Sequence, residues 1–88
     1  MYSIELKPQA QKFIEAQSKK IQQQLIKRIE ILATNPHPPQ SKLLHAGEAL
    51  YRYRSGVYRI IYQIQEKKLL IVVAKIGHRK NVYKRLSD

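Results

Sequence analysis

The sequence predicts an α+β fold: an N-terminal strand and a two-helix hairpin packed on a small, mainly antiparallel sheet, followed by a short basic C-terminal segment. Two observations support this prediction. Apolar residues recur at helical spacing between residues 8 and 34, and apolar runs typical of strands follow from residue 50 onward. A chain of 88 residues can build one modest core, so we expect a single domain over residues 1–88.

The N-terminal half begins with an expected strand at residues 2–6, where apolar and polar side chains alternate. Pro8 suits the first turn of a helix, which the apolar spacing extends to about Gln17. Ser18 is a suitable N-cap for a second helix, which we expect to stop at Asn35-Pro36.

The C-terminal half predicts three strands joined by two hairpin turns. The strands are expected at Leu50–Arg54, Val57–Gln65 and Leu69–Ile76, with turns at Ser55-Gly56 and Glu66–Lys68. Every residue from 69 to 74 is apolar, as in a strand buried on both faces, so the last strand is expected to be central.

Two proline- or glycine-containing segments are expected to interrupt regular structure. Residues 37–41 contain two prolines directly after Pro36 and predict an extended surface connection. Gly77 is expected to end the last strand, and residues 78–86 to form a basic surface segment with one or two helical turns.

The charge is strongly positive and uneven. The chain has 17 Lys and Arg against 6 Asp and Glu, a formal charge of +11. Residues 1–41 have a net charge of +3 and residues 42–88 a net charge of +8. Such a surface favours polyanions, nucleic acid above all, although basic domains also bind acidic proteins.

Composition also narrows the class of protein. Without cysteine the chain has no disulfides, thiolate metal sites or cysteine nucleophiles, and it fits a reducing compartment. The first residues do not resemble an export signal, and no apolar run reaches 18 residues. We therefore expect a cytoplasmic protein that does not bind or cross a membrane.

Three arginines are expected to converge in the hairpin. Arg52 and Arg54 are two residues apart on one strand and so share a face, and Arg59 follows on the neighbouring strand. Guanidinium groups match phosphate oxygens in pairs, which predicts a phosphate site. The alternative is a solvated outer face on which the arginine stems cover tyrosine rings.

A second basic cluster follows the central strand and includes one aromatic hydroxyl, Tyr83. Its cationic or titratable members are Lys75, His78, Arg79, Lys80, Lys84 and Arg85. The six acidic residues are scattered and the three histidines lack zinc-ligand spacing, so we expect no metal and no cofactor.

The segment LYRYRSGVYRIIY at residues 50–62, followed by IGHR at residues 76–79 and by Val82-Tyr83, resembles the signature of the RelE/ParE toxin superfamily. The likeness extends from Tyr2 to about Arg85. It implies a toxin of a type II toxin-antitoxin system. In RelE-like members the implied activity is endonucleolytic cleavage of messenger RNA in the ribosomal A site, with the ribose 2′-hydroxyl as nucleophile and no cofactor.

The resemblance also implies roles for individual residues. Arg52, Arg54, Arg59 and Arg79 match basic active-site positions, and Tyr83 matches the tyrosine proposed as general base in RelE-like enzymes. The best-studied branch has lysine at the first two positions, and arginine cannot readily release a proton. His78 is one candidate for the acid, and a surface or packing role is its alternative.

Three functions are compatible with this resemblance. The first is the ribosome-dependent endoribonuclease, favoured because Arg59, Arg79 and Tyr83 are present. The second is a ParE-like inhibitor of DNA gyrase without nuclease activity, and the third is an inactive ribosome-binding relative. The first two imply a cognate antitoxin, and an acidic binding segment would suit a charge of +11.

Overall fold

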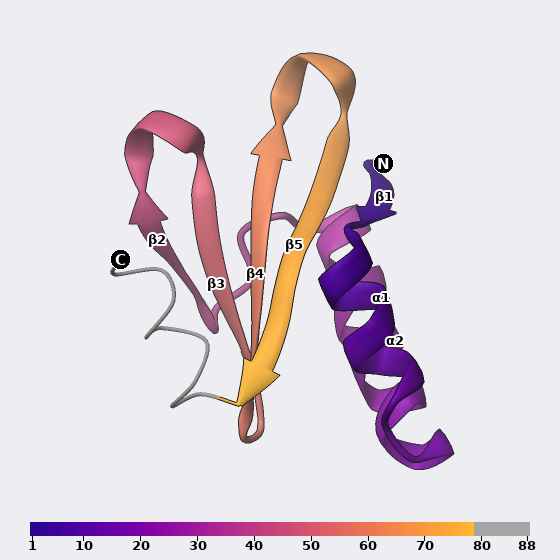
Figure 1. Ribbon diagram of the computed structural model, residues 1–88. Coiled ribbons are helices and arrows are strands. Elements are labelled where there is room, and N and C mark those ends of the chain that lie inside the picture. Colours follow the sequence, from indigo (N-terminus) through magenta and orange to yellow (C-terminus); the bar gives the residue numbers. More distant parts are fainter. Residues whose placement is uncertain (79–88) are drawn as a thin grey trace.

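The computed structural model describes residues 1–78, which form a five-stranded mixed sheet with two helices packed on one face (Figure 1). The strand order is β1-β5-β4-β3-β2. Strand β1 (Ser3–Leu6) is parallel to β5 (Leu70–His78), whereas β2 (Ser41–His45), β3 (Leu50–Ser55), β4 (Tyr58–Gln65) and β5 form antiparallel neighbours. The predicted fold class is confirmed.

The two helices begin where local chemistry predicts, and the first ends at Glu15, two residues before the expected Gln17. Helix α1 (Pro8–Glu15) has its proline in the first turn, where the missing N–H costs no intrahelical bond. Helix α2 (Lys19–Thr34) is capped by Ser18, whose hydroxyl accepts a hydrogen bond from the Ile21 N–H at 3.3 Å. It ends before Asn35-Pro36, as expected.

The core lies between the helices and the sheet. It combines apolar residues of α1 and α2 with the inward side chains of β3, β4 and β5: Ala10, Ile14, Leu25, Ile29, Leu32, Tyr53, Ile60, Tyr62, Ile64, Ile71, Val73 and Ile76. Strand β5 is buried at Ile71, Val72 and Val73 and lies between β1 and β4. The prediction of a central last strand is confirmed.

Both predicted hairpin turns are present, and each contains a left-handed residue. Gly56 in the β3–β4 turn has φ +61°, a conformation that glycine adopts without steric cost. The β4–β5 connection is a short 3-10 helix at Glu66–Lys68 followed by Leu69 with φ +49°. A leucine in this region is strained, because its Cβ approaches the neighbouring carbonyl oxygen.

Two sequence-based expectations about strand boundaries were wrong. Strand β2 was not predicted: it begins at Ser41, within the proline-rich connection, and pairs with β3 from Ser41↔Tyr53 to His45↔Leu50. Gly77 does not end the last strand, because it is paired with Arg59 on β4 and the ladder continues to His78.

The Gln9 side chain supports the C-terminal end of β5. Pairing with β1 stops at Val73, and beyond it the Gln9 amide donates to the Ile76 carbonyl at 3.0 Å and accepts from the Ile76 N–H at 2.9 Å. One side chain on α1 therefore takes the place of a neighbouring strand.

Among the described helices, none is long and apolar enough to cross a membrane.

Candidate nucleic-acid interface

The β3–β4 hairpin brings the three predicted arginines onto one face of the sheet. Arg54 and Arg59 are paired directly opposite each other, and Arg52 is paired with Ile61 on the same face. This face lies opposite α1 and α2, and we call it the outer face. Directly opposed residues on adjacent antiparallel strands have Cβ atoms roughly 5 Å apart, so these guanidinium groups can meet at one phosphate.

A β-bulge adds Lys75 to the same face. Ile61 pairs with Lys75 and Tyr62 with Val73, so Ala74 is an extra residue on β5. Side chains alternate along a regular strand, and without this extra residue Lys75 would point to the core side with Val73. The bulge turns Lys75 outward, and Arg52, Arg54, Arg59 and Lys75 together form what we call the basic cluster.

The cluster combines positive charge with burial. Arg52 and Arg59 are only 8% and 6% exposed, whereas Arg54 is exposed. Within residues 1–78 the ion pairs are Lys7–Glu5 and His45–Glu48, both at 3.7 Å, so no described carboxylate neutralises Arg52. Like charges held close, two of them nearly buried, favour an anion in their midst.

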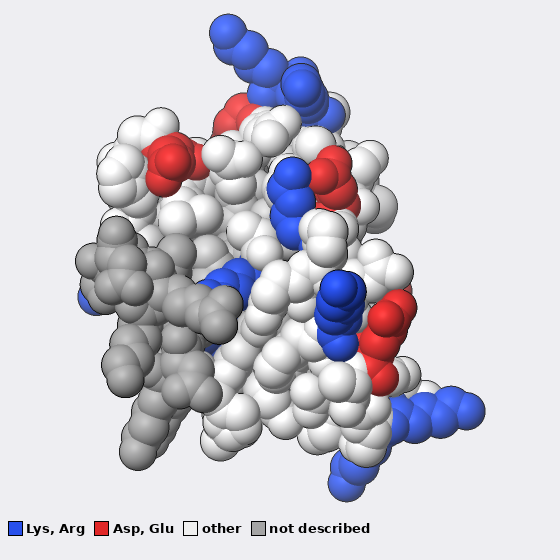
Figure 2. Space-filling model, in the orientation of Figure 1, with Lys and Arg blue, Asp and Glu red and all other residues white. Residues whose placement is uncertain are grey.

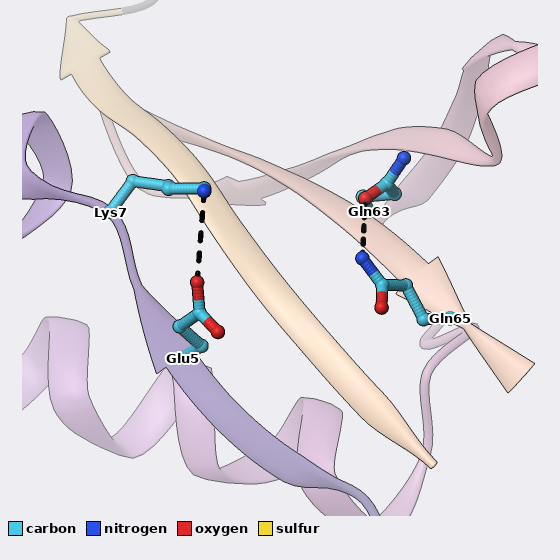
Figure 3. A network of polar contacts seen from close by, with 4 residues as sticks. All are labelled: Glu5, Lys7, Gln63 and Gln65. Atoms are coloured by element: carbon cyan, nitrogen blue, oxygen red, sulfur yellow. Dashed lines mark hydrogen bonds and ion pairs between the residues drawn. The ribbon is translucent and has the colours of Figure 1, made fainter. Parts of the chain in front are cut away.

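Beyond the basic cluster and Lys42 on β2, which is paired with Arg52, the outer face is mainly polar. Figure 3 shows Glu5 and Lys7 joined at the β1 edge, and the Gln65 amide donating to the Gln63 side-chain oxygen at 3.1 Å on β4. Gln63 also donates to the Glu48 carbonyl at 3.0 Å. In Figure 2 several red side chains of the visible face lie directly beside blue ones. The positive charge of the outer face is therefore concentrated in the basic cluster and in Lys42.

The structure separates His78 from the basic cluster. His78 pairs with Tyr58, and their rings lie 5.3 Å apart on the side of the sheet that faces the helices. The Phe13 ring of α1 lies 5.8 Å from the Tyr58 ring in an edge-to-face contact. Arg59 directly follows Tyr58 on β4, so its side chain points to the opposite face of the sheet. This placement favours a packing role for His78.

The remaining predicted site residues lie outside the described residues: Arg79, Lys80, Tyr83, Lys84 and Arg85. Within the described part of the chain, no group of three or more His, Asp or Glu side chains could hold a metal ion. The lysine and arginine side chains of the outer face are suited to bind phosphate.

Two hollows near the cluster were not predicted from the sequence. A cavity of about 240 Å³ is lined by Pro39, Gln40, Ser41, Arg52 and Arg54, where β2 meets β3. A larger groove of about 640 Å³ lies between α2 and the β3–β4 turn, with Ile21, Ile31 and Val57 among its apolar residues and Lys27 and Arg28 among its charged ones. Strand β2 was not predicted from the sequence, so the wall that it provides for the first cavity could not be predicted either.

The two-helix hairpin on a mixed sheet with a basic outer face defines a toxin of the RelE/ParE superfamily. The RelE toxin in the archaeal RelE–RelB complex from Pyrococcus horikoshii superimposes with a TM-score of 0.81 at 26% identity, over 91% of this chain and 97% of that one. The isolated Escherichia coli RelE toxin has the same fold, with a TM-score of 0.75 at 23% identity over 99% and 96% of the two chains.

Sequence comparison identifies the family. The family model of the ParE toxin of type II toxin-antitoxin systems (parDE) matches residues 4–83, and the chain belongs to this family. A protein of Escherichia coli named as a RelE-like toxin is 30% identical over 90 residues, covering 99% of this chain and 95% of the relative. A protein of Methanocaldococcus jannaschii named as toxin RelE1 is 36% identical over 59 residues, covering 64% and 66%.

Proposed function

We propose that this toxin is a ribosome-dependent, metal-independent endoribonuclease that cleaves messenger RNA in the ribosomal A site. The observation that supports this most is the basic cluster, in which four cations from three adjacent strands share the outer face. In-line attack of a 2′-hydroxyl on the adjacent phosphate gives a phosphorane with more negative charge than the ground state. Fixed cations around that charge lower the barrier without any metal.

We assign Arg59 and the residues of the C-terminal segment separate roles in this reaction. Arg59 is held by the neighbouring strands and is nearly buried, so its guanidinium is preorganised beside the scissile phosphate. By their positions in the motif, Arg79 stabilises the same charge and Tyr83 accepts the 2′-hydroxyl proton. Tyrosine ordinarily titrates near pH 10, and surrounding guanidinium groups favour its phenolate. Lys80, Lys84 and Arg85 bind RNA through charge.

Lys75 is our proposed acid for the leaving 5′-oxygen. Arginine cannot release a proton readily, so Lys75 is the member of the basic cluster that can protonate a leaving group. It lies diagonally across from Arg59, at a Cα separation of roughly 7–8 Å for such a pair. Lys75→Arg keeps the charge and is expected to lower kcat by about 10²-fold or more. A substrate with sulfur in place of the 5′-oxygen needs little protonation and should restore the rate.

The direct test is messenger RNA cleavage in a purified translation system, with new 5′ ends mapped. Wild type should cut only translated message, and both Arg59→Ala and the double variant Arg79→Ala/Tyr83→Phe should leave it intact while remaining folded. Intact RNA with arrested translation would instead indicate an inactive ribosome-binding relative.

Inhibition of DNA gyrase is the second candidate function. It is favoured by one observation, the match of residues 4–83 to the ParE toxin model. A supercoiling assay with purified gyrase separates the two candidates. Inhibition at nanomolar toxin, with RNA left intact, would replace the nuclease proposal.

We also propose that a cognate antitoxin binds the groove between α2 and the β3–β4 turn. Four solved relatives are RelE toxins bound to RelB antitoxins, from Pyrococcus horikoshii, Escherichia coli, Mycobacterium tuberculosis and Methanococcus jannaschii. Ile31 is 39% and Val57 53% exposed beside Lys27 and Arg28, a composition suited to an acidic amphipathic segment. Val57→Asp should weaken neutralisation by the antitoxin without reducing RNA cleavage.

A further inference from the structure

The end of β5 has no strand neighbour on the side where β1 stops. Parallel pairing with β1 ends at Leu6↔Val73, and the Lys7 N–H still donates to the Val73 carbonyl at 3.0 Å. The chain then enters α1, whereas β5 continues along β4 to His78. Residues 74–78 therefore border a described strand on one side only.

The side chain of Gln9 makes the hydrogen bonds that a strand would make there. Its amide donates to the Ile76 carbonyl at 3.0 Å and accepts from the Ile76 N–H at 2.9 Å. Gln9 is three residues beyond Leu6, and Ile76 is three residues beyond Val73, so the side chain continues the register of the parallel pair. Gln9 is itself exposed and does not belong to the hydrophobic core, so its described contribution to the fold is this pair of hydrogen bonds.

Gln9 binds β5 directly after the β-bulge that sets the direction of Lys75. The extra residue, Ala74, turns Lys75 to the outer face and Ile76 into the core, where it is fully buried. A slip by one residue would reverse both directions. Ile76 is held by Gln9, while Lys75 and Gly77 pair with β4, so the bulged register is fixed from both edges of β5.

We propose that Gln9 is a positioning residue for the Lys75 ammonium, although α1 lies on the other face of the sheet. This inference rests on the proposed nuclease function, in which Lys75 protonates the leaving 5′-oxygen. Lys75 lies diagonally across from Arg59, and that relation depends on the bulged register. Gln9 contacts no substrate, and it keeps the acid at the cleavage centre through the backbone of Ile76.

The first test compares Gln9→Met with wild type in the purified translation system, using the full chain. Methionine has a similar length and forms neither hydrogen bond to Ile76. A displacement of about 1 Å can lower a rate by about 10²-fold, so a partial displacement should lower kcat about tenfold and change KM by less than about twofold. Gln9→Glu keeps the acceptor for the Ile76 N–H and should lower kcat only about threefold.

A message with sulfur in place of the 5′-oxygen at the cut position separates positioning from a general loss of structure. The thiolate leaves with little protonation, so Gln9→Met should cut this substrate within about twofold of the wild-type rate. A loss of equal size on both substrates, or no loss on either, overturns the proposal. Lys75→Arg should show the same difference between substrates, and an equal loss in that variant rejects Lys75 as the acid and with it the role of Gln9.

Two control variants match the change in other respects. Gln11→Met alters the same residue type in α1, where the amide donates to the Glu15 carboxylate at 3.3 Å on the exposed surface, and should cut both substrates like wild type. Ile29→Val truncates the core at α2 and leaves both hydrogen bonds of Gln9 in place. It lowers stability, so any loss of activity should be equal on the two substrates.

An NMR measurement tests the geometry without any cleavage. Lys75 and Ile61 are paired directly on the outer face, so their side chains should give nuclear Overhauser effects in wild type that weaken in Gln9→Met. The core pair Ile64 and Ile71 is the internal reference and should stay unchanged. Unchanged effects between Lys75 and Ile61 overturn the proposal. Weakened effects in a protein that leaves RNA intact would retain the positioning of Lys75 and reject the nuclease proposal.

Discussion

Arg52 is expected to lower the free energy of unfolding, because its buried Nε has no hydrogen-bond partner among the described residues until phosphate binds. The substitution Arg52→Met tests this expectation. Methionine fills the volume of the arginine stem and has no charge. The substitution removes an unpartnered buried donor, which costs about 1–3 kcal/mol, and the repulsion from Lys42, which is paired directly opposite and costs about 0.2–1 kcal/mol. We expect the free energy of unfolding to rise by about 2 kcal/mol.

Thermal unfolding followed by circular dichroism measures this gain. For a domain of this size about 2 kcal/mol corresponds to an increase in Tm of about 8–16 °C at low salt. The matched control is Arg54→Met, which removes an exposed charge from the same strand and should change stability by less than about 1 kcal/mol. Added phosphate should raise the Tm of wild type and have little effect on Arg52→Met, because binding to the folded state stabilises it.

A lower Tm for Arg52→Met than for wild type would refute this reasoning. It would mean that the guanidinium contributes to the fold through contacts of its own. A gain of equal size in Arg54→Met would also contradict it, since the effect would then come from net charge and not from burial.

Three further predictions concern the framework that holds the cluster. Gln9→Ala leaves the Ile76 N–H and carbonyl without partners and should lower the free energy of unfolding by about 1–3 kcal/mol, measured by urea denaturation; a change below about 0.5 kcal/mol would contradict the role of the amide. Leu69→Gly relieves a left-handed leucine that is 53% exposed and should stabilise the protein by about 0.5–1 kcal/mol, whereas Lys68→Gly beside it should destabilise. Burial raises the pKa of Tyr62 to about 12, above the value of about 10 in the unfolded chain, so its contribution to stability is present below pH 10 and is lost as pH rises to 12. Tyr62→Phe should flatten this part of the stability profile, and an unchanged profile would refute the assignment.

The helices and the arginine pair could be predicted because short-range chemistry determines them. Ser18 and Asn35-Pro36 mark both ends of α2, and the Ser55-Gly56 turn fixes the register that pairs Arg54 with Arg59. In such cases a few adjacent residues specify the geometry, and no distant contact alters it.

The bulge and β2 could not be predicted, because the residues involved give no local signal. Residues 69–74 are uniformly apolar, so their pattern is the same with or without an extra residue at Ala74, and the face of Lys75 stays undetermined. Strand β2 is short, irregular and adjacent to prolines, and its pairing with β3 is what makes it a strand. The cavity between β2 and β3 depends on that same pairing.

The chemistry of the RNA ends tests the central claim most directly. Message cut in the purified translation system should carry a 2′,3′-cyclic phosphate on the upstream fragment and a 5′-hydroxyl on the downstream one. A single 2′-deoxynucleotide at the cut position should abolish cleavage. Downstream fragments with a 5′-phosphate, or cleavage that survives the deoxy substitution, would contradict a 2′-hydroxyl nucleophile activated by this basic face.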